Sequence, residues 1–178
     1  MTRRLLLLTS LIVLTGCTAM PSVGTQEHAG RFSLRVVRNS KSENISGRWR
    51  LQKAPHVTEL TLMTPLYGVL ARITVTAAGA TLERPNKTND NLFDSASTAE
   101  ELMLRHLGFA LPIDMLSSWL YGHPWEHRPF QRTTEGFVQS GWLVSAKRTK
   151  ANGSPALVTL IQPETLTQAG ITVNLTIE

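Results

Sequence analysis

The side chains best suited to metal or covalent chemistry are five histidines and one cysteine, in a chain of 178 residues. His123 and His127 have the i, i+4 spacing that could place two imidazoles on one side of a helix to bind a metal ion. Pro124 and Pro129 interrupt any helix at this point. We therefore expect no metal site. A single cysteine also excludes an internal disulfide.

Sequence patterns typical of enzymes are missing as well. The chain contains no G-x-S-x-G elbow, P-loop or dinucleotide-binding glycine pattern. Asp90, Asp94 and Asp114 fall in or beside expected loops and helix starts, where aspartate usually caps. Glu100 and Glu101 lie together in an expected first helical turn, where the helix dipole favours acidic residues. We predict no catalytic residue, no cofactor and no enzymatic activity.

The cysteine stands at the end of an export signal. Two arginines at positions 3 and 4 precede ten mostly apolar residues, 5–14. This run is shorter than the roughly 20 residues needed to cross a bilayer, and is typical of a cleaved signal. Leu14-Thr15-Gly16-Cys17 resembles a bacterial lipobox, in which the cysteine thiol receives a diacylglycerol and the signal is removed before it. An ordinary signal with an incidental cysteine is the alternative.

We therefore predict a signal peptide over residues 1–16 and a lipid on Cys17. Removal of the signal leaves 162 residues and lowers the formal net charge from +5 to +3, because Arg3 and Arg4 are lost. An aspartate after the lipidated cysteine commonly retains bacterial lipoproteins in the inner membrane. Thr18 stands there instead, which predicts the outer membrane, with the domain facing the periplasm. Residues 17–30 carry Pro and Gly without periodicity and are expected to form a flexible tether.

Most of the remaining chain alternates between apolar and polar residues. Alternation with a period of two runs from Arg31 to Leu82 and again from Trp142 to Ile177, interrupted by turn residues. This pattern predicts antiparallel strands with one buried face. Asn39 to Asn44 is expected to be a turn, and Pro85 to Asp94 a polar loop. Arginines on the polar face are those of a solvated surface, and in a secreted, lipidated chain we expect no nucleic-acid partner.

Between the two groups of strands the period becomes helical. Ser97-Thr98-Ala99-Glu100 is a capping-box pattern, and Gly108 is a suitable residue to end the helix that follows. A second helix is expected from Ile113 to Tyr121. Nine or ten strands in about 150 residues must curl, because a long flat sheet is unstable. We predict a mainly β fold with α, in which an open, curved antiparallel sheet of residues 31–178 holds both helices on its concave apolar face.

Three segments carry a resemblance to a known family. Leu60–Ile73 is similar to the pattern L-x-L-T-x-P-L-G-x-x-x-A-x-L, and Leu107–Pro124 to L-G-x-x-L-P-V-x-x-L-x-x-W-L-x-G-x-P. The closing segment Gly170–Ile177 also fits. In order and spacing these segments resemble the outer-membrane lipoprotein receptor LolB, over nearly the whole chain.

The resemblance implies a fold, a function and partners. The fold would be an unclosed β-barrel whose helices cover an apolar cavity. The function would be to accept lipoproteins from the soluble periplasmic carrier LolA and to incorporate them into the outer membrane by acyl-chain transfer. Its partners would be LolA, the acylated lipoprotein cargo and outer-membrane lipids, and we expect the protein to act as a monomer.

The resemblance also suggests site residues. In the family, an exposed leucine in the loop after the proline is important for placing cargo in the membrane, and the matching residue is Leu66, between Pro65 and Tyr67. Tyr67 departs from the usual Pro-Leu-Gly, and without the resemblance a buried turn leucine would be expected. For the acyl-chain cavity we expect the following residues, each of which could instead be plain core: Trp49, Leu51, Leu60, Leu62, Leu70, Ile73, Leu116, Trp119 and Leu120.

Two other functions are compatible with a lipidated β domain. One is an envelope-assembly lipoprotein that binds protein partners rather than lipid. The other is a lipid-anchored hydrolase whose site matches no known pattern.

Overall fold

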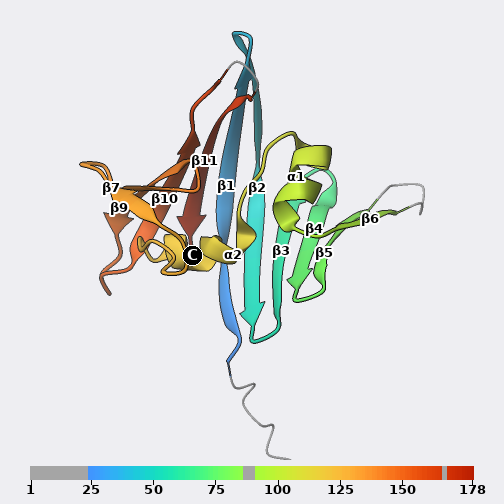
Figure 1. The fold of residues 1–178 in the computed structure, drawn as a ribbon, viewed down its shortest axis with the longest axis horizontal. Coiled ribbons are helices and arrows are strands. Elements are labelled where there is room, and N and C mark those ends of the chain that lie inside the picture. The colour runs from blue at the N-terminus through green and yellow to red at the C-terminus, as the bar shows by residue number, and fades with distance from the viewer. Residues whose placement is uncertain (1–23, 86–90, 166–167) are drawn as a thin grey trace, which may run out of the picture.

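The computed structural model describes residues 24–85, 91–165 and 168–178, which form a single antiparallel sheet with two helices. The sheet has 11 strands in the order β6-β5-β4-β3-β2-β1-β11-β10-β9-β8-β7 (Figure 1). The strands are β1 (Gln26–Arg38), β2 (Lys41–Ala54), β3 (Val57–Thr64), β4 (Gly68–Thr76), β5 (Gly79–Arg84), β6 (Leu92–Ala96), β7 (Phe130–Arg132), β8 (Phe137–Gln139), β9 (Trp142–Thr149), β10 (Pro155–Gln162) and β11 (Gly170–Ile177).

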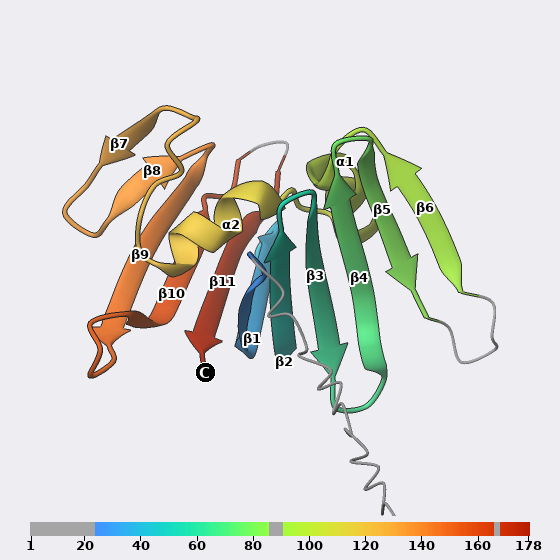
Figure 2. The same ribbon diagram turned by 90° about the horizontal axis from the view of Figure 1, so that it is seen from below.

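The sheet is open, as the sequence predicted. Its edge strands β6 and β7 lie far apart, on opposite sides of the helices (Figure 2). Both helices, α1 (Ala99–Leu107) and α2 (Ile113–Leu120), cover the same face of the sheet (Figure 1). The first and last strands of the domain, β1 and β11, pair side by side at its centre, so the two groups of strands expected from the sequence join there.

The buried face follows from the alternation of side chains along each strand. Trp49 and Leu51 on β2, Ile73 on β4 and Leu160 on β10 are at most 1% exposed, while their polar neighbours point to the other face. The core lies between this face and the helices. None of the helices in the described ranges has the length and apolar character needed to span a membrane.

A glycine on β1 allows the central strands to approach closely. A Cβ atom at Gly30 would lie 1.7 Å from the carbonyl oxygen of Thr176 on β11, so no other residue fits. The indole Nε1 of Trp49 donates to the carbonyl oxygens of Arg31 and Thr176, each at 3.2 Å. This tryptophan therefore fastens β2 across β1 to β11, and its ring stays in the core.

The helix ends confirm most of the capping predictions. The side chain of Thr98 accepts a hydrogen bond from the backbone N–H of Glu101, so the capping pair lies one residue later than the predicted Ser97 and Glu100. Gly108 ends α1 with φ 78°, in the left-handed region that favours glycine. The second helix ends at Leu120, one residue before the predicted end.

The strands differ from the prediction where alternation is weak. Only Asn39 and Ser40 form the expected turn of residues 39–44, and β2 begins at Lys41. Residues 41–44 are all polar and exposed, so they show no hydrophobic pattern. β6 begins inside the expected loop, and β7 and β8 have three residues each, too few to show a period. β1 begins at Gln26, where the tether was expected to continue to residue 30, because residues 26–30 pair with β2.

Candidate functional site

An apolar cavity lies between the sheet and the helices. Its wall comes from β1, β2, β3 and β11 on one side, and from α1, α2 and the connector between them (residues 108–112) on the other. The lining residues are Phe32, Leu34, Trp49, Leu60, Leu62, Met103, Phe109, Leu111, Leu116, Val173 and Leu175. No polar side chain is among them, so the cavity suits hydrocarbon and offers nothing to a polar ligand.

The cavity is small in this structure. Its volume is about 40 Å³, whereas pockets that hold a drug-sized ligand measure roughly 300–1,000 Å³. The helices therefore lie in a closed position. An acyl chain can be taken up only if a helix or the connector moves away from the sheet.

The predicted cavity residues fall into three groups. Trp49, Leu60, Leu62 and Leu116 line the cavity. The other core residues of the set are fully buried but do not line it: Leu51, Ile73, Trp119 and Leu120. Leu70 forms the third group alone, because it neither lines the cavity nor is fully buried.

A β-bulge explains the position of Leu70. Leu62 pairs with Ala71, but the next residue, Met63, pairs with Val69, so Leu70 is an extra residue in β4 and has no partner in β3. Alternation along β4 also places Leu70 on the opposite side from the buried residues Ala71 and Ile73, so predicting Leu70 together with Ile73 for the cavity did not follow the alternation.

Sequence reasoning missed seven of the lining residues. Phe32 and Leu34 on β1, and Val173 and Leu175 on β11, follow the same alternation as the predicted residues and could have been found from the central pairing of β1 with β11. Met103 lies on the apolar face of α1. The two connector residues Phe109 and Leu111 have no periodic signal.

The loop between β3 and β4 is fully exposed. Thr64 pairs with Gly68, which leaves Pro65, Leu66 and Tyr67 as a three-residue turn. Leu66 is 83% exposed and Tyr67 is 62% exposed, so Leu66 is not a buried turn residue. Gly68 has φ 67°, a conformation that accommodates the additional Tyr67 in the turn.

This loop stands close to the cavity. A Cβ atom at Gly47 on β2 would lie 2.0 Å from the carbonyl oxygen of Met63 and 2.9 Å from Cε1 of Phe32. The end of β3 therefore crosses tightly beside a residue that lines the cavity. A groove of about 550 Å³, which we call the loop groove, lies here. It is lined by Arg31, Phe32, Ser46, Gly47, Arg48, Met63, Thr64 and Pro65.

A buried glutamine holds α2 in place. Gln139 on β8 is 1% exposed, and its Oε1 accepts from Nε1 of Trp119 at 2.8 Å and from the backbone N–H of Trp125 at 2.9 Å. Its Nε2 donates to the carbonyl oxygens of Trp125 and Arg128 at 2.8 and 2.9 Å. All these bonds lie at the end of α2 and in the segment after it. Unpaired buried polar groups are costly, so this network fixes α2 to the sheet.

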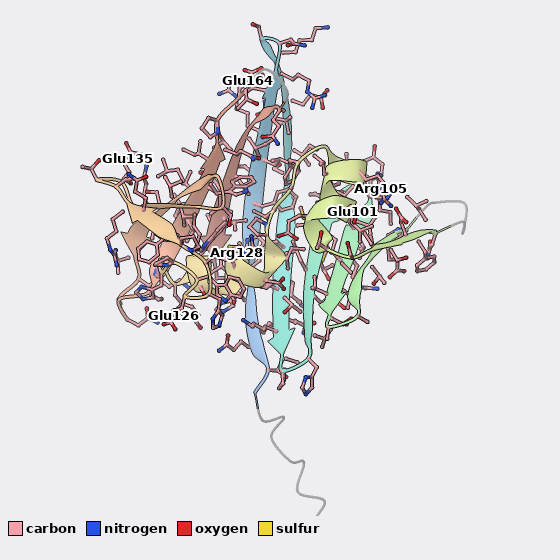
Figure 3. The ribbon with its side chains drawn as sticks, viewed as in Figure 1. Glu101, Arg105, Glu126, Arg128, Glu135 and Glu164 are labelled. Atoms are coloured by element: carbon pink, nitrogen blue, oxygen red, sulfur yellow. The ribbon has the colours of Figure 1, made fainter. Side chains whose placement is uncertain are left out.

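α1 is held at the surface instead. Asp94 on β6 accepts from Arg105 at 2.6 Å and lies 2.7 Å from Nε2 of His106. Glu101 lies beside Arg105 on the same helix, 2.8 Å away (Figure 3). The hydrogen bonds from His106, Arg105 and the backbone of Ser95 lower the pKa of Asp94 to about 2. Exposed ion pairs contribute little to stability, so α1 is held mainly by its buried residues Ala99, Leu102 and Met103. The connector is tied to β9 by a hydrogen bond of 3.2 Å from Nε1 of Trp142 to the carbonyl oxygen of Ala110.

The histidines do not form a metal site. His123 and His127 lie exposed in the segment after α2, and His28 lies on β1 rather than in the tether, with its ring 5.1 Å from that of Tyr121. No group of three or more His, Cys, Asp or Glu side chains within the described ranges could hold a metal ion.

Comparison with known proteins shows the family of this chain. The family model described as outer membrane lipoprotein LolB matches residues 26–178. The chain belongs to the LolB family. Three proteins named outer-membrane lipoprotein LolB illustrate the similarity. The protein of Cupriavidus pinatubonensis is 36% identical over 155 residues, which cover 79% of this chain and 73% of the relative.

The other two are more distant. The LolB protein of Cupriavidus metallidurans is 34% identical over 135 residues, which cover 72% of this chain and 64% of the relative, slightly less than two thirds of its length. That of Vibrio campbellii is 31% identical over 150 residues, covering 76% and 71%. Membership in the LolB family confirms the outer-membrane location that Thr18 predicted. Cys17 and Thr18 themselves lie outside the described residues.

The Gln139 network yields a stability prediction. Gln139→Leu removes the Gln139 partner of the indole N–H of Trp119, the backbone N–H of Trp125 and the carbonyl oxygen of Arg128. It should lower the free energy of unfolding by about 3 kcal/mol, from roughly 1–3 kcal/mol per unpaired group. Urea unfolding followed by tryptophan fluorescence measures the change. The control Gln131→Leu, on the exposed strand β7, should change stability by less than about 0.5 kcal/mol. Equal effects would show that the network does not hold α2.

The ion pairs of α1 yield a titration prediction. Because the folded pKa of Asp94 is lowered, its contribution to stability is present above pH of about 4 and is lost as the pH falls towards 2. Carboxyl-carbon NMR should show Asp94 titrating near pH 2. His106→Phe and Arg105→Gln should each raise this midpoint, whereas Arg132→Gln, on β7, should leave it unchanged. A midpoint near 4 in the unmodified protein would show that these contacts do not form in solution.

Proposed function

We propose that the protein accepts acylated lipoproteins from the periplasmic carrier LolA and incorporates them into the outer membrane. It would be anchored there by a lipid on Cys17, after removal of residues 1–16, with the residues between Cys17 and β1 as its tether. The observation that carries this proposal is the wholly apolar cavity beneath α1, α2 and the connector, next to a loop that exposes Leu66.

The transfer of acyl chains needs no catalytic residue. Burying hydrocarbon stabilises a complex by about 0.8 kcal/mol per methylene, so a carrier and a receptor can exchange cargo without making or breaking a covalent bond. The side chains that matter are those that shield the chains from water. An all-apolar wall shields the acyl chains from water, and the volume of the cavity changes with the position of α1 and the connector.

The exposed loop supports delivery into a membrane. Leu66 and Tyr67 are apolar or amphipathic side chains at the tip of a hairpin, where contact with lipid would bury them. Tyrosine favours the interface between lipid and water. A loop that enters the membrane beside the cavity would bring the acyl chains of the cargo close to the bilayer before they leave the protein.

A transfer assay tests the proposal against the two alternatives. The protein lacking residues 1–16, with Cys17 replaced to keep it soluble, is mixed with LolA that carries an acylated lipoprotein. We expect the cargo to move to this protein. Binding of LolA without movement of cargo would favour an envelope-assembly role, and turnover of ester substrates would favour a hydrolase. Absence of any acyl-chain binding would contradict the proposal.

The loop yields a separate prediction. Leu66→Glu places a charge at the tip and should abolish insertion of cargo into vesicles, while the variant still accepts cargo from LolA, because Leu66 does not line the cavity. Fractionation of vesicles after the transfer reaction measures both steps. The matched control is Leu104→Glu, another exposed leucine, on α1, which should insert cargo normally. If Leu66→Glu inserted cargo at the normal rate, the loop would be only a turn.

A further inference from the structure

One end of β2 has no neighbouring strand on the side of β3, although β2 lies in the middle of the sheet. β2 pairs with β1 along Lys41–Lys53, but its pairing with β3 begins only at Arg48. Within the described ranges, no strand therefore pairs with residues 41–47 on the side of β3. We call residues 41–47 of β2 the free edge.

The turn that opens β2 determines which backbone groups are available there. Asn39 and Ser40 form a two-residue turn with positive φ at both positions, so Arg38 and Lys41 close it as a hydrogen-bonded pair. Bonding with β1 then alternates along β2 through Glu43 and Ile45. The N–H and C=O groups of the residues between them point away from β1 and towards the free edge: Ser42, Asn44 and Ser46.

The tip of the hairpin between β1 and β2 is held on the side away from the free edge. The backbone N–H of Asn39 donates to Oε1 of Glu164, which follows β10, at 2.9 Å (Figure 3). β1 also pairs with β11 up to Val37. The free edge is therefore supported by its neighbours and does not depend on a strand at the side of β3.

Open space lies at both ends of the free edge. At one end, the loop groove lies along Ser46 and Gly47 and shares Phe32 with the cavity. At the other end, a separate groove of about 440 Å³ lies along Lys41 and Glu43 and is also lined by Leu107 of α1 and by Gly108. The hydroxyl of Thr64, in the loop groove, is buried without a hydrogen-bond partner.

We propose that the free edge binds the peptide that follows the lipidated cysteine of the cargo, as an added β-strand. The inference rests on the proposed function: with the acyl chains in the cavity, this peptide would leave past Phe32, which lines both the cavity and the loop groove beside the free edge. The predicted tether of this chain shows the kind of segment that follows a lipidated cysteine: residues 18–25 carry no charge and no periodic apolar pattern. Main-chain pairing recognises such a segment whatever its sequence, and one receptor can then serve cargoes that share only the lipid.

Two synthetic probes test the inference with the full-length lipidated protein in phosphatidylethanolamine vesicles. One is a diacylglyceryl-cysteine followed by an eight-residue polar peptide, and the other is the same lipidated cysteine without the peptide. We expect the lipopeptide to bind about tenfold more tightly, the ratio produced by two or three net hydrogen bonds. Competition against a fluorescent copy of the shorter probe measures both affinities.

Variants of the edge separate the backbone from the side chain. Asn44→Pro removes an outward N–H and should abolish most of the tenfold preference, because proline at an unpaired edge leaves the β1 ladder intact. Asn44→Ala retains the N–H and should retain the preference. Methylation of alternate amides of the peptide should have the same effect as Asn44→Pro, and this arm does not depend on the folding of a variant.

The two probes distinguish a failure of this inference from a failure of the proposed function. If neither probe binds, the acyl-chain function itself fails. Equal binding of both probes, or a preference that survives both Asn44→Pro and amide methylation, would overturn the role of the free edge and leave the function intact. If Asn44→Pro changed only self-association in sedimentation, the edge would instead pair with a second copy of the chain.

Discussion

An open sheet has an apolar face that no second sheet covers, and the rest of the structure depends on how two short helices cover it. α2 is held by Gln139, which makes four hydrogen bonds with Trp119 at the end of the helix and with the segment after it. α1 buries fewer residues than α2 and is also held by the exposed ion pairs of Asp94. If one wall of the cavity moves, these contacts favour movement of α1 over movement of α2.

The size of the cavity follows from the same constraint. An empty space large enough for acyl chains would lose packing on every side and would destabilise the protein. A cavity of about 40 Å³ avoids this cost. Under the proposed function, the space for cargo would open only when hydrocarbon is available to fill it, and uptake would replace contacts between α1 and the sheet by contacts with the acyl chain. The close approach of Met63 and Phe32 to Gly47 places the exposed loop beside this space.

The sequence predicted most of the architecture because its signals are local. Alternation along β1 to β5 and β9 to β11 gave the buried face, and residues 97–100 and Gly108 marked the ends of α1 to within one residue. The sequence did not predict features that depend on pairing between strands. Leu70 is the extra residue of a bulge beside Met63, residues 41–44 show no apolar pattern although they form a strand, and Gln139 is an ordinary polar residue until three partners surround it. The lining residues Phe109 and Leu111 belong to an irregular connector, whose position follows from the two helices it joins.

The most direct test of the central claim is to locate the acyl chain inside the protein. A photoreactive benzoylphenylalanine is placed at Leu62, which lines the cavity, or at Leu70, which lies eight residues later and does not. After cargo is transferred from LolA, irradiation should cross-link the acyl chains to position 62 and not to position 70, as mass spectrometry of the lipid-modified peptides would show. Equal cross-linking at both positions, or none at position 62 while cargo is bound, would contradict transfer through the cavity.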